Sequence, residues 1–158
     1  RRNKHVKIEL SLGKLPPALK SFTIPGHDLR IGQVITNLLE NARSFVPDGT
    51  GRILVKLEPT ADFMRILVED NGPGISSENT DRIFERFYTD RPAGEAFGQN
   101  SGLGLSISKQ IIDAHKGRIW AENRYGRAPE GVEKPVLGAR FVVRLPAVAD
   151  DWTSPVAK

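Results

Sequence analysis

Apolar and polar positions follow two different periods in the first third of the chain. Residues 6–10 alternate between apolar and polar side chains, as a strand with one buried face does. Residues 29–42 repeat apolar side chains at helical spacing, and Asp28 occupies the expected N-cap position. The pattern therefore predicts a strand followed by a long helix that ends before Pro47.

The rest of the chain mixes strand and helix patterns without a repeating order. Strands are predicted over 52–58 and 64–69, and the polar turn between them favours an antiparallel hairpin. Two more strands are predicted over 118–122 and 139–145, joined by a polar stretch over 123–138. Because no βαβ order repeats, the pattern indicates an α+β fold.

Two helices are predicted in the middle of the chain, on either side of an aperiodic loop. The first helix spans residues 81–87. Residues 89–101 have no periodicity, and a loop of this length is typical of a lid or a binding loop. The second helix is closed by Gly117. Its apolar stripe consists of Leu103, Ile107, Ile111 and Ala114.

Composition narrows the class of protein. A chain of 158 residues with 39% hydrophobic and 27% charged residues has the size and composition of one soluble globular domain. No apolar run approaches the roughly 18 to 20 residues that cross a bilayer, and the absence of cysteine excludes disulfides. The net charge of +4 comes from residues 1–20, so no nucleic-acid-binding face is predicted. The first residue is not methionine, which suggests a piece of a longer protein.

Asn37 and Asn41 are four residues apart in the predicted long helix. Their carboxamides therefore share one face, with about 6 Å of rise between them. Two neutral oxygen ligands side by side suit a Mg²⁺ ion that already carries phosphates. Taken alone, however, such a pair is better explained as two exposed polar residues on an amphipathic helix.

Two glycine-rich segments each follow a predicted strand or precede a predicted helix. Asp70-Asn71-Gly72-Pro73-Gly74 places a carboxylate at the end of a strand, before a turn. Gly102-Leu103-Gly104-Leu105 opens a helix, where backbone N–H groups can meet phosphate oxygens. Taken singly, the first could be only a tight turn, and the second only a site of close helix packing.

Four segments in this order resemble the catalytic, ATP-binding domain of sensor histidine kinases, in the superfamily shared with gyrase B, Hsp90 and MutL. They are Asn37-Leu38-Leu39-Glu40-Asn41-Ala42 (N box), Asp70-Asn71-Gly72-Pro73-Gly74 (G1 box), Ile83-Phe84-Glu85-Arg86-Phe87-Tyr88 (F box) and Gly102-Leu103-Gly104-Leu105 (G2 box). The resemblance covers roughly residues 5–146. More narrowly, residues 41–45 are similar to those of ChvG-type kinases of alphaproteobacteria.

The resemblance implies a two-layer α/β sandwich (the Bergerat fold), in which a mixed, mostly antiparallel sheet carries helices on one face. ATP would lie between the layers under a lid that joins the F and G2 boxes. The catalytic domain is then expected over residues 1–146, with a disordered tail over 147–158. The phosphoacceptor dimerisation domain is expected to be absent from this chain.

The resemblance also implies a role for each box. Asp70 would accept a hydrogen bond from the exocyclic amino group of adenine, which favours ATP over GTP. Gly72 and Gly74 would remove side chains where the base lies against the backbone. Asn41, with Asn37, would hold the Mg²⁺ that bridges the phosphates.

Phosphate contacts are implied at the second glycine-rich segment, through a hydroxyl and backbone donors of Ser101, Gly102, Leu103, Gly104 and Leu105. Arg86 or Arg91 would offer a cation near the γ-phosphate. The ring of Phe45 would stack or pack. Four apolar residues are expected in the core, where some would also line the pocket: Ile75, Phe84, Phe87 and Leu105.

The chain departs from the family at Ser44, where Lys or Arg is frequent, and at Phe45, where Tyr is frequent. Ser44 removes a cation that would face the phosphates. A more informative difference from the water-activating relatives is Asn37, which stands where they carry a glutamate general base. A carboxamide cannot take a proton from water at neutral pH.

The resemblance implies that the nucleophile is a histidine on a separate dimerising helical hairpin, and none of His5, His27 and His115 lies in such a context. The resemblance implies that Mg²⁺-ATP donates its γ-phosphate to that hairpin in a two-component pathway. A response regulator would be an indirect partner. The chain would be the cytoplasmic part of a parent anchored in the bacterial inner membrane.

Two other functions remain open from the sequence. The first is a superfamily ATPase that drives a protein clamp, against which Asn37 argues. The second is a degenerate, nucleotide-sensing interaction module, for which Ser44 is a slight argument.

Overall fold

The computed structural model describes residues 5–13, 28–60, 62–86 and 104–146. Its elements are β1 (Val6–Leu12), α1 (Asp28–Phe45), β2 (Gly51–Pro59), β3 (Phe63–Asp70), the 3-10 turns η1 (Ser77–Asn79) and η2 (Arg82–Phe84), α2 (Gly104–Ala114), β4 (Arg118–Tyr125) and β5 (Val136–Pro146). The predicted loop over 89–101 and the tail over 147–158 lie outside the described residues.

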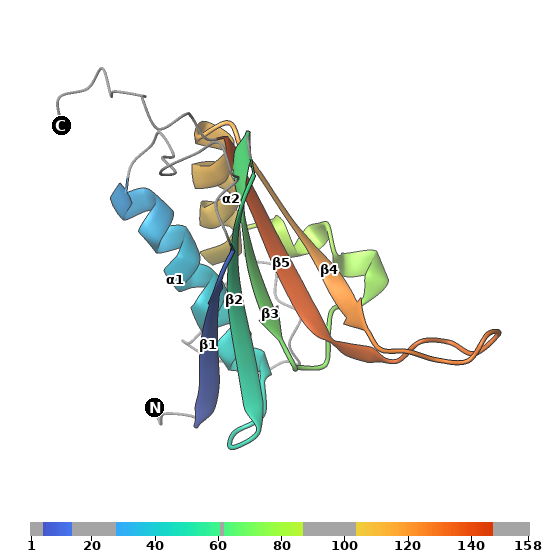
Figure 1. Cartoon of the computed structure of the whole chain (residues 1–158). Helices are drawn as coiled ribbons and strands as arrows, with labels where there is room; N and C mark the ends of the chain where they lie inside the picture. The colour runs from blue at the N-terminus through green and yellow to red at the C-terminus, as the bar shows by residue number, and fades with distance from the viewer. Residues whose placement is uncertain (1–4, 14–27, 61, 87–103, 147–158) are drawn as a thin grey trace, which may run out of the picture.

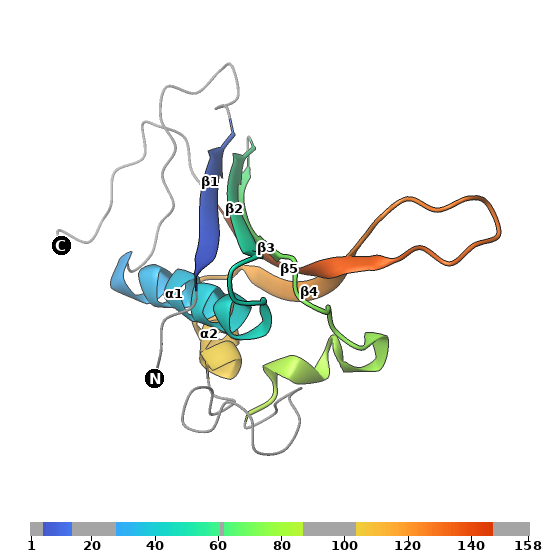
Figure 2. The same cartoon turned by 90° about the horizontal axis from the view of Figure 1, so that it is seen from below.

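One mixed sheet and two α helices make up the described fold. The strands run in the order β1-β2-β3-β5-β4, with β1 parallel to β2 and the other pairs antiparallel. Both α helices lie on one face of the sheet (Figure 1 and Figure 2). The predicted α+β sandwich is therefore confirmed. None of the helices in these ranges is long and apolar enough to span a bilayer.

The predicted hairpin between β2 and β3 is present. Val55 lies opposite Val68 in the register, and both side chains are buried. Thr60 closes the turn, because its hydroxyl accepts the Phe63 N–H at 3.0 Å and donates to the Phe63 carbonyl at 2.8 Å. Buried β-branched residues and a local side-chain bond thus specify the same hairpin.

The β4–β5 hairpin is longer than predicted. β4 continues to Tyr125 and β5 begins at Val136, so the polar stretch over 123–138 is partly strand. Its polar side chains concealed the strand pattern because Asn123 and Arg124 hydrogen-bond to the end of β3 and the turn beyond it. Residues 126–135 project from the body as a narrow arm (Figure 2).

The core fills the space between the helices and the sheet, and α2 faces it differently from the prediction. Ile111 is buried, as expected, but Ala114 is exposed, and Ser108 and Ile112 complete the buried row. Residues 108, 111 and 112 have the helical spacing of one face, whereas Ala114 is the last residue of α2. Leu103 lies outside the described residues.

The helix predicted over 81–87 is also corrected. Only Arg82–Phe84 forms a turn, of 3-10 type, and Glu85 is already extended with ψ of 149°. One turn is sufficient, because Ile83 is buried and Phe84 packs edge-to-face on Phe141 with ring centroids 6.1 Å apart. Phe87 lies outside the described residues.

α2 ends in a hydrogen-bonded turn in which Lys116, not Gly117, adopts the left-handed conformation, with φ of 62°. The N–H groups of Gly117 and Lys116 donate to the carbonyls of Ile112 and Asp113 at 2.9 and 3.0 Å. Gly117 serves a different purpose, since a Cβ there would collide with the Arg144 carbonyl of β5.

Candidate functional site

Asp70 lies at the end of β3 and is only 4% exposed. Its Oδ1 accepts hydrogen bonds from the N–H groups of Gly72 at 2.9 Å and Ala139 at 3.1 Å. Within the described residues no donor is bonded to Oδ2. Burial raises the pKa of Asp70, although the two N–H groups and the Arg124 charge oppose the shift. The carboxylate is thus fixed by one oxygen and open at the other.

The turn after Asp70 packs against two other parts of the molecule. A Cβ at Gly72 would lie 3.0 Å from the Phe45 carbonyl at the end of α1. Gly74 has φ of 87°, and a Cβ there would lie 2.8 Å from Asn123 Oδ1. The two glycines therefore allow the turn to pack closely on other parts of the protein. This requirement for glycine holds independently of any ligand.

Asn37 joins the two α helices. Its Nδ2 donates to the Gly104 carbonyl and to Ser108 Oγ, both at 3.2 Å. A Cβ at Gly104 would approach the Asn37 side chain at 3.8 Å, so the first residue of α2 lies directly against this carboxamide. The half-buried Asn37 is not a solvated residue of an amphipathic helix.

Asn41 lies one helical turn further along α1 and is only 8% exposed. Its carboxamide makes no hydrogen bond within the part of the chain that the structure describes, whereas its backbone carbonyl accepts the Ser44 hydroxyl at 2.6 Å. The carboxamide atoms are therefore available to a ligand that enters beside α1. Asn41 therefore has the properties of a ligand-binding group, and the exposed-residue alternative is wrong for it too.

The remaining predicted site residues separate into three groups. Ile75, Phe84 and Leu105 are half-buried and pack on the core, as the sequence predicted. Phe45 is half-buried at the end of α1, and Arg86 is exposed. Five predicted residues lie outside the described part of the chain: Phe87, Arg91, Ser101, Gly102 and Leu103.

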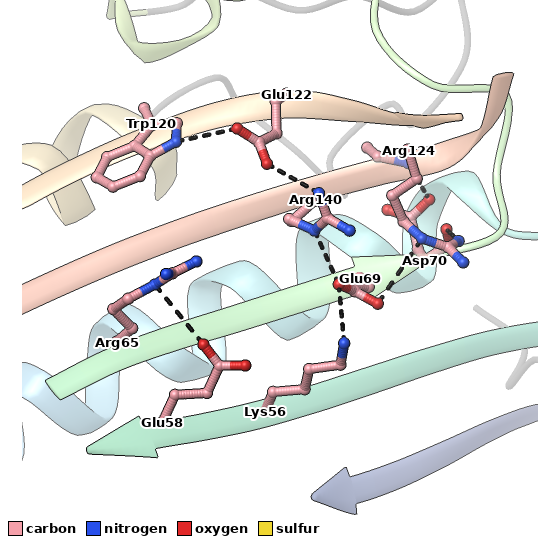
Figure 3. A network of polar contacts seen from close by, with 10 residues as sticks. Lys56, Glu58, Arg65, Glu69, Asp70, Trp120, Glu122, Arg124 and Arg140 are labelled. Carbon is pink, nitrogen blue, oxygen red and sulfur yellow. Dashed lines mark hydrogen bonds and ion pairs between the residues drawn. The ribbon is translucent and has the colours of Figure 1, made fainter. Parts of the chain in front are cut away.

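Two residues that the sequence analysis did not assign to the site hold its turn in place. Asn123 Oδ1 accepts the Ile75 N–H and Asn123 Nδ2 donates to the Ile75 carbonyl, both at 2.7 Å. Arg124 Nη1 donates to the Asp70 carbonyl at 2.6 Å (Figure 3). A longer β4 in the prediction would have revealed both, because they lie in the segment assigned to a polar loop.

No protein-only metal cluster accounts for the site. The described residues contain no group of three or more His, Cys, Asp or Glu side chains that could hold a metal ion. The carboxamide oxygen of Asn41 is a neutral donor of the kind that a hard cation accepts.

Three features agree with the family that follows: the fold, the Asp70 carboxylate with hydrogen bonds at Oδ1 alone, and the face of α1 that carries Asn37 and Asn41. Residues 26–149 match the family described as histidine kinase-, DNA gyrase B-, and HSP90-like ATPase. The chain belongs to this family.

Particular relatives narrow the likeness to sensor kinases. The sensor protein ChvG of Agrobacterium fabrum is 55% identical over 149 residues, which are 92% of this chain and 24% of that protein. The mycobacterial sensor histidine kinase MprB superposes with a TM-score of 0.68 and 26% identity, over 91% of this chain and 83% of that one. The histidine kinase ThkA in complex with the response regulator TrrA gives a TM-score of 0.64 and 28% identity, over 89% of this chain and 34% of that one. The predicted resemblance, including the narrower one to ChvG, is confirmed, and the chain spans about a quarter of the length of ChvG.

Proposed function

We propose that this chain binds Mg²⁺-ATP and presents the γ-phosphate to a histidine on a separate helical phosphoacceptor domain of its parent protein. The reaction would transfer the phosphoryl group from ATP to an imidazole nitrogen, with ADP as the leaving group. Positioning and charge stabilisation supply most of the catalysis in such transfers, so a separate nucleophile is compatible with this site.

The proposal rests on the hydrogen bonding of the Asn37 side chain. Its carboxamide donates from Nδ2 to Gly104 and Ser108, and so it is held as a structural tie between α1 and α2. An amide in this position cannot act as a general base toward water. Transfer to an external nucleophile is therefore favoured over hydrolysis and over a clamp ATPase.

The nucleotide would be held at both ends. Asp70 Oδ2 would accept from the adenine amino group, and the N-terminal region of α2 would face the phosphates. Asn41 would provide an oxygen for Mg²⁺, with Asn37 beside it, and the bound ion would neutralise phosphate charge. These assignments rest on the burial of Asp70 and Asn41 and on their open hydrogen-bonding atoms.

The test is a reconstitution with the purified helical hairpin of the parent and ATP labelled in the γ-phosphate. Wild type is expected to label the hairpin histidine, and Asn41→Ala to reduce the labelling at least tenfold. Gln33→Ala is the matched control, because it removes an exposed polar side chain from the same helix and leaves labelling unchanged.

Other outcomes would contradict the proposal. Sustained ATP hydrolysis without transfer would support the clamp ATPase, and nucleotide binding with neither reaction would support the sensor module. The same proposal extends to the parent: a membrane-anchored sensor whose phosphoryl group passes to a response regulator, as the ThkA–TrrA complex suggests by similarity.

A further inference from the structure

Asn123 hydrogen-bonds to both backbone polar groups of Ile75, in the turn that follows β3. Both polar atoms of its carboxamide are used, because Oδ1 accepts the Ile75 N–H and Nδ2 donates to the Ile75 carbonyl, each at 2.7 Å. The two residues are 48 positions apart in the chain. A side chain of β4 thus replaces the strand pairing that the backbone of residue 75 would otherwise lack.

The hydrogen bonds between Asn123 and Ile75 act on Asp70 through the turn that joins them. Gly72 lies between Asp70 and Ile75, and its N–H is one of the two donors to Asp70 Oδ1. The position of Gly72 therefore contributes to the direction in which the carboxylate plane faces. A displaced turn would leave Oδ1 with the Ala139 N–H as its single donor, and the direction of Oδ2 would be less well fixed.

The composition of the turn makes such a restraint necessary. Gly72 and Gly74 have wide conformational freedom, and Gly74 is held at φ of 87°. Asn71 secures the β2 side of the turn, since its Oδ1 accepts the Arg52 N–H at 2.8 Å. On the opposite side Asn123 has the corresponding role.

A carboxamide of this length is chemically specific for the task. Aspartate could accept the Ile75 N–H but would place a second acceptor against the Ile75 carbonyl, and alanine could make neither bond. The serine hydroxyl can both accept and donate, but the side chain is one atom shorter than that of asparagine, so we expect it to keep at most one of the two bonds. The residue type therefore predicts a graded series of variants.

We propose that Asn123 is a positioning residue for nucleotide recognition: through Ile75 and Gly72 it orients the Asp70 carboxylate and so sets the preference for adenine. The inference rests on the proposed nucleotide site, in which Asp70 meets the exocyclic amino group. Asn123 would act through the turn, because both polar atoms of its carboxamide are bonded to Ile75.

The test compares ATP with inosine triphosphate, which carries a carbonyl in place of the amino group. Calorimetric Kd values for both nucleotides are measured with wild type, Asn123→Ala, Asn123→Asp and Asn123→Ser, next to thermal unfolding of each. Asn123→Ala is expected to weaken ATP binding about tenfold, as the loss of two part-buried hydrogen bonds that position the site predicts. Binding of inosine triphosphate should change less, so the preference for ATP shrinks.

The variants and the control separate positioning from folding. Asn123→Asp should weaken ATP binding as much as Asn123→Ala does, and Asn123→Ser should weaken it less. Asn123→Ser is the mildest change, so the series includes a variant that is expected to fold. Tyr125→Ala removes an exposed side chain of the same strand and should leave both Kd values unchanged.

A lowered Tm with unchanged ATP affinity and unchanged nucleotide preference in the folded variants would overturn the inference while the nucleotide site stands. Failure of wild type to bind ATP, or to prefer it over inosine triphosphate, would instead refute the proposed site and the inference with it.

Discussion

Glu69 and Asp70 are neighbours on β3, and they occupy opposite faces of the same sheet. Both are almost fully buried, at 5% and 4% exposure. Burial by itself raises the pKa of each carboxyl. For Glu69 the hydrogen bond and charge of Arg140, together with Lys56 and Arg124, outweigh burial and lower the pKa. For Asp70 only two N–H groups and the Arg124 charge oppose burial, and the pKa stays raised.

The difference separates a structural carboxylate from one that is suited to a ligand. Glu69 is bonded to Arg140 Nε at 2.8 Å and lies 3.5 Å from Lys56 Nζ and 3.7 Å from Arg124 Nε (Figure 3). Its partners satisfy it within the fold. Asp70 lacks such compensation at Oδ2, so a ligand that brings a donor can stabilise it.

Arg124 connects the two sides of this comparison. Its Nε lies near Glu69, while its Nη1 donates to the backbone carbonyl of Asp70 rather than to the carboxylate. The guanidinium thus positions Asp70 without neutralising the oxygen that remains open.

The largest expected effect is that of Asp70→Asn on ATP affinity. The variant keeps an oxygen for the two N–H groups but would turn an amide donor toward the adenine amino group. We expect binding to weaken about 10- to 100-fold, as for lost hydrogen bonds to a charged group. Calorimetry provides the measurement, and unfolding should show equal or greater stability because an uncompensated charge is removed.

Asp113→Asn is the matched control for that variant, since Asp113 is exposed on α2 and paired only with Lys109 in the described residues. It should bind ATP like wild type. Equal affinity of wild type and Asp70→Asn would show that the adenine assignment is wrong.

Glu69→Gln should lower the stability of the fold and leave ATP affinity nearly unchanged, which is the reverse of the effect of Asp70→Asn. The change removes the negative charge among three cations, and we expect a loss of about 2 kcal/mol in the free energy of unfolding, with ATP affinity within twofold of wild type. The estimate is below that for a fully buried ion pair because the three cation side chains are 27–33% exposed.

Urea denaturation measures this effect, and Glu58→Gln is its control. The Glu58–Arg65 pair is 3.7 Å long with side chains 42% and 41% exposed, so its loss should cost less than about 0.5 kcal/mol. Similar costs for the two glutamate variants would show that the buried Glu69 with its three cations adds no more stability than an exposed ion pair.

A smaller effect concerns pH, and its sign differs between the two residues. The folded pKa of Glu69 is lowered, so its stabilisation is present above the ordinary glutamate pKa and is lost as pH falls through the folded value. The folded pKa of Asp70 is raised, so protonation favours the folded state and wild type gains stability relative to Asp70→Asn as pH falls through that value.

Urea midpoints of wild type and both variants between about pH 7 and pH 3 measure these trends. The difference between wild type and Glu69→Gln should shrink in acid, while wild type should approach Asp70→Asn or overtake it. Parallel curves for all three proteins would contradict both pKa directions.

Much of the fold follows from local patterns. The helix from Asp28 and the β2–β3 hairpin are specified by apolar periodicity and turn chemistry, and both formed where predicted. The error at β4 has a clear physical cause, since this strand was cut short where its polar side chains bond to another segment. A pattern of burial cannot reveal a strand whose polar residues are satisfied by distant partners.

Four short boxes in a fixed order identified the family without coordinates. The residue pattern also placed Asp70 at a strand end and an amide at position 37. Whether each polar group has a partner, in contrast, depends on the tertiary structure. The β3–β5 register sets Arg140 opposite Glu69, and the β4–β5 register sets Glu122 opposite Arg140, so their charges meet. The open Oδ2 of Asp70 and the hydrogen bonds between Asn123 and Ile75 arise in the same way. In each case the partner of a polar group, or its lack of one, depends on contacts between segments far apart in the chain.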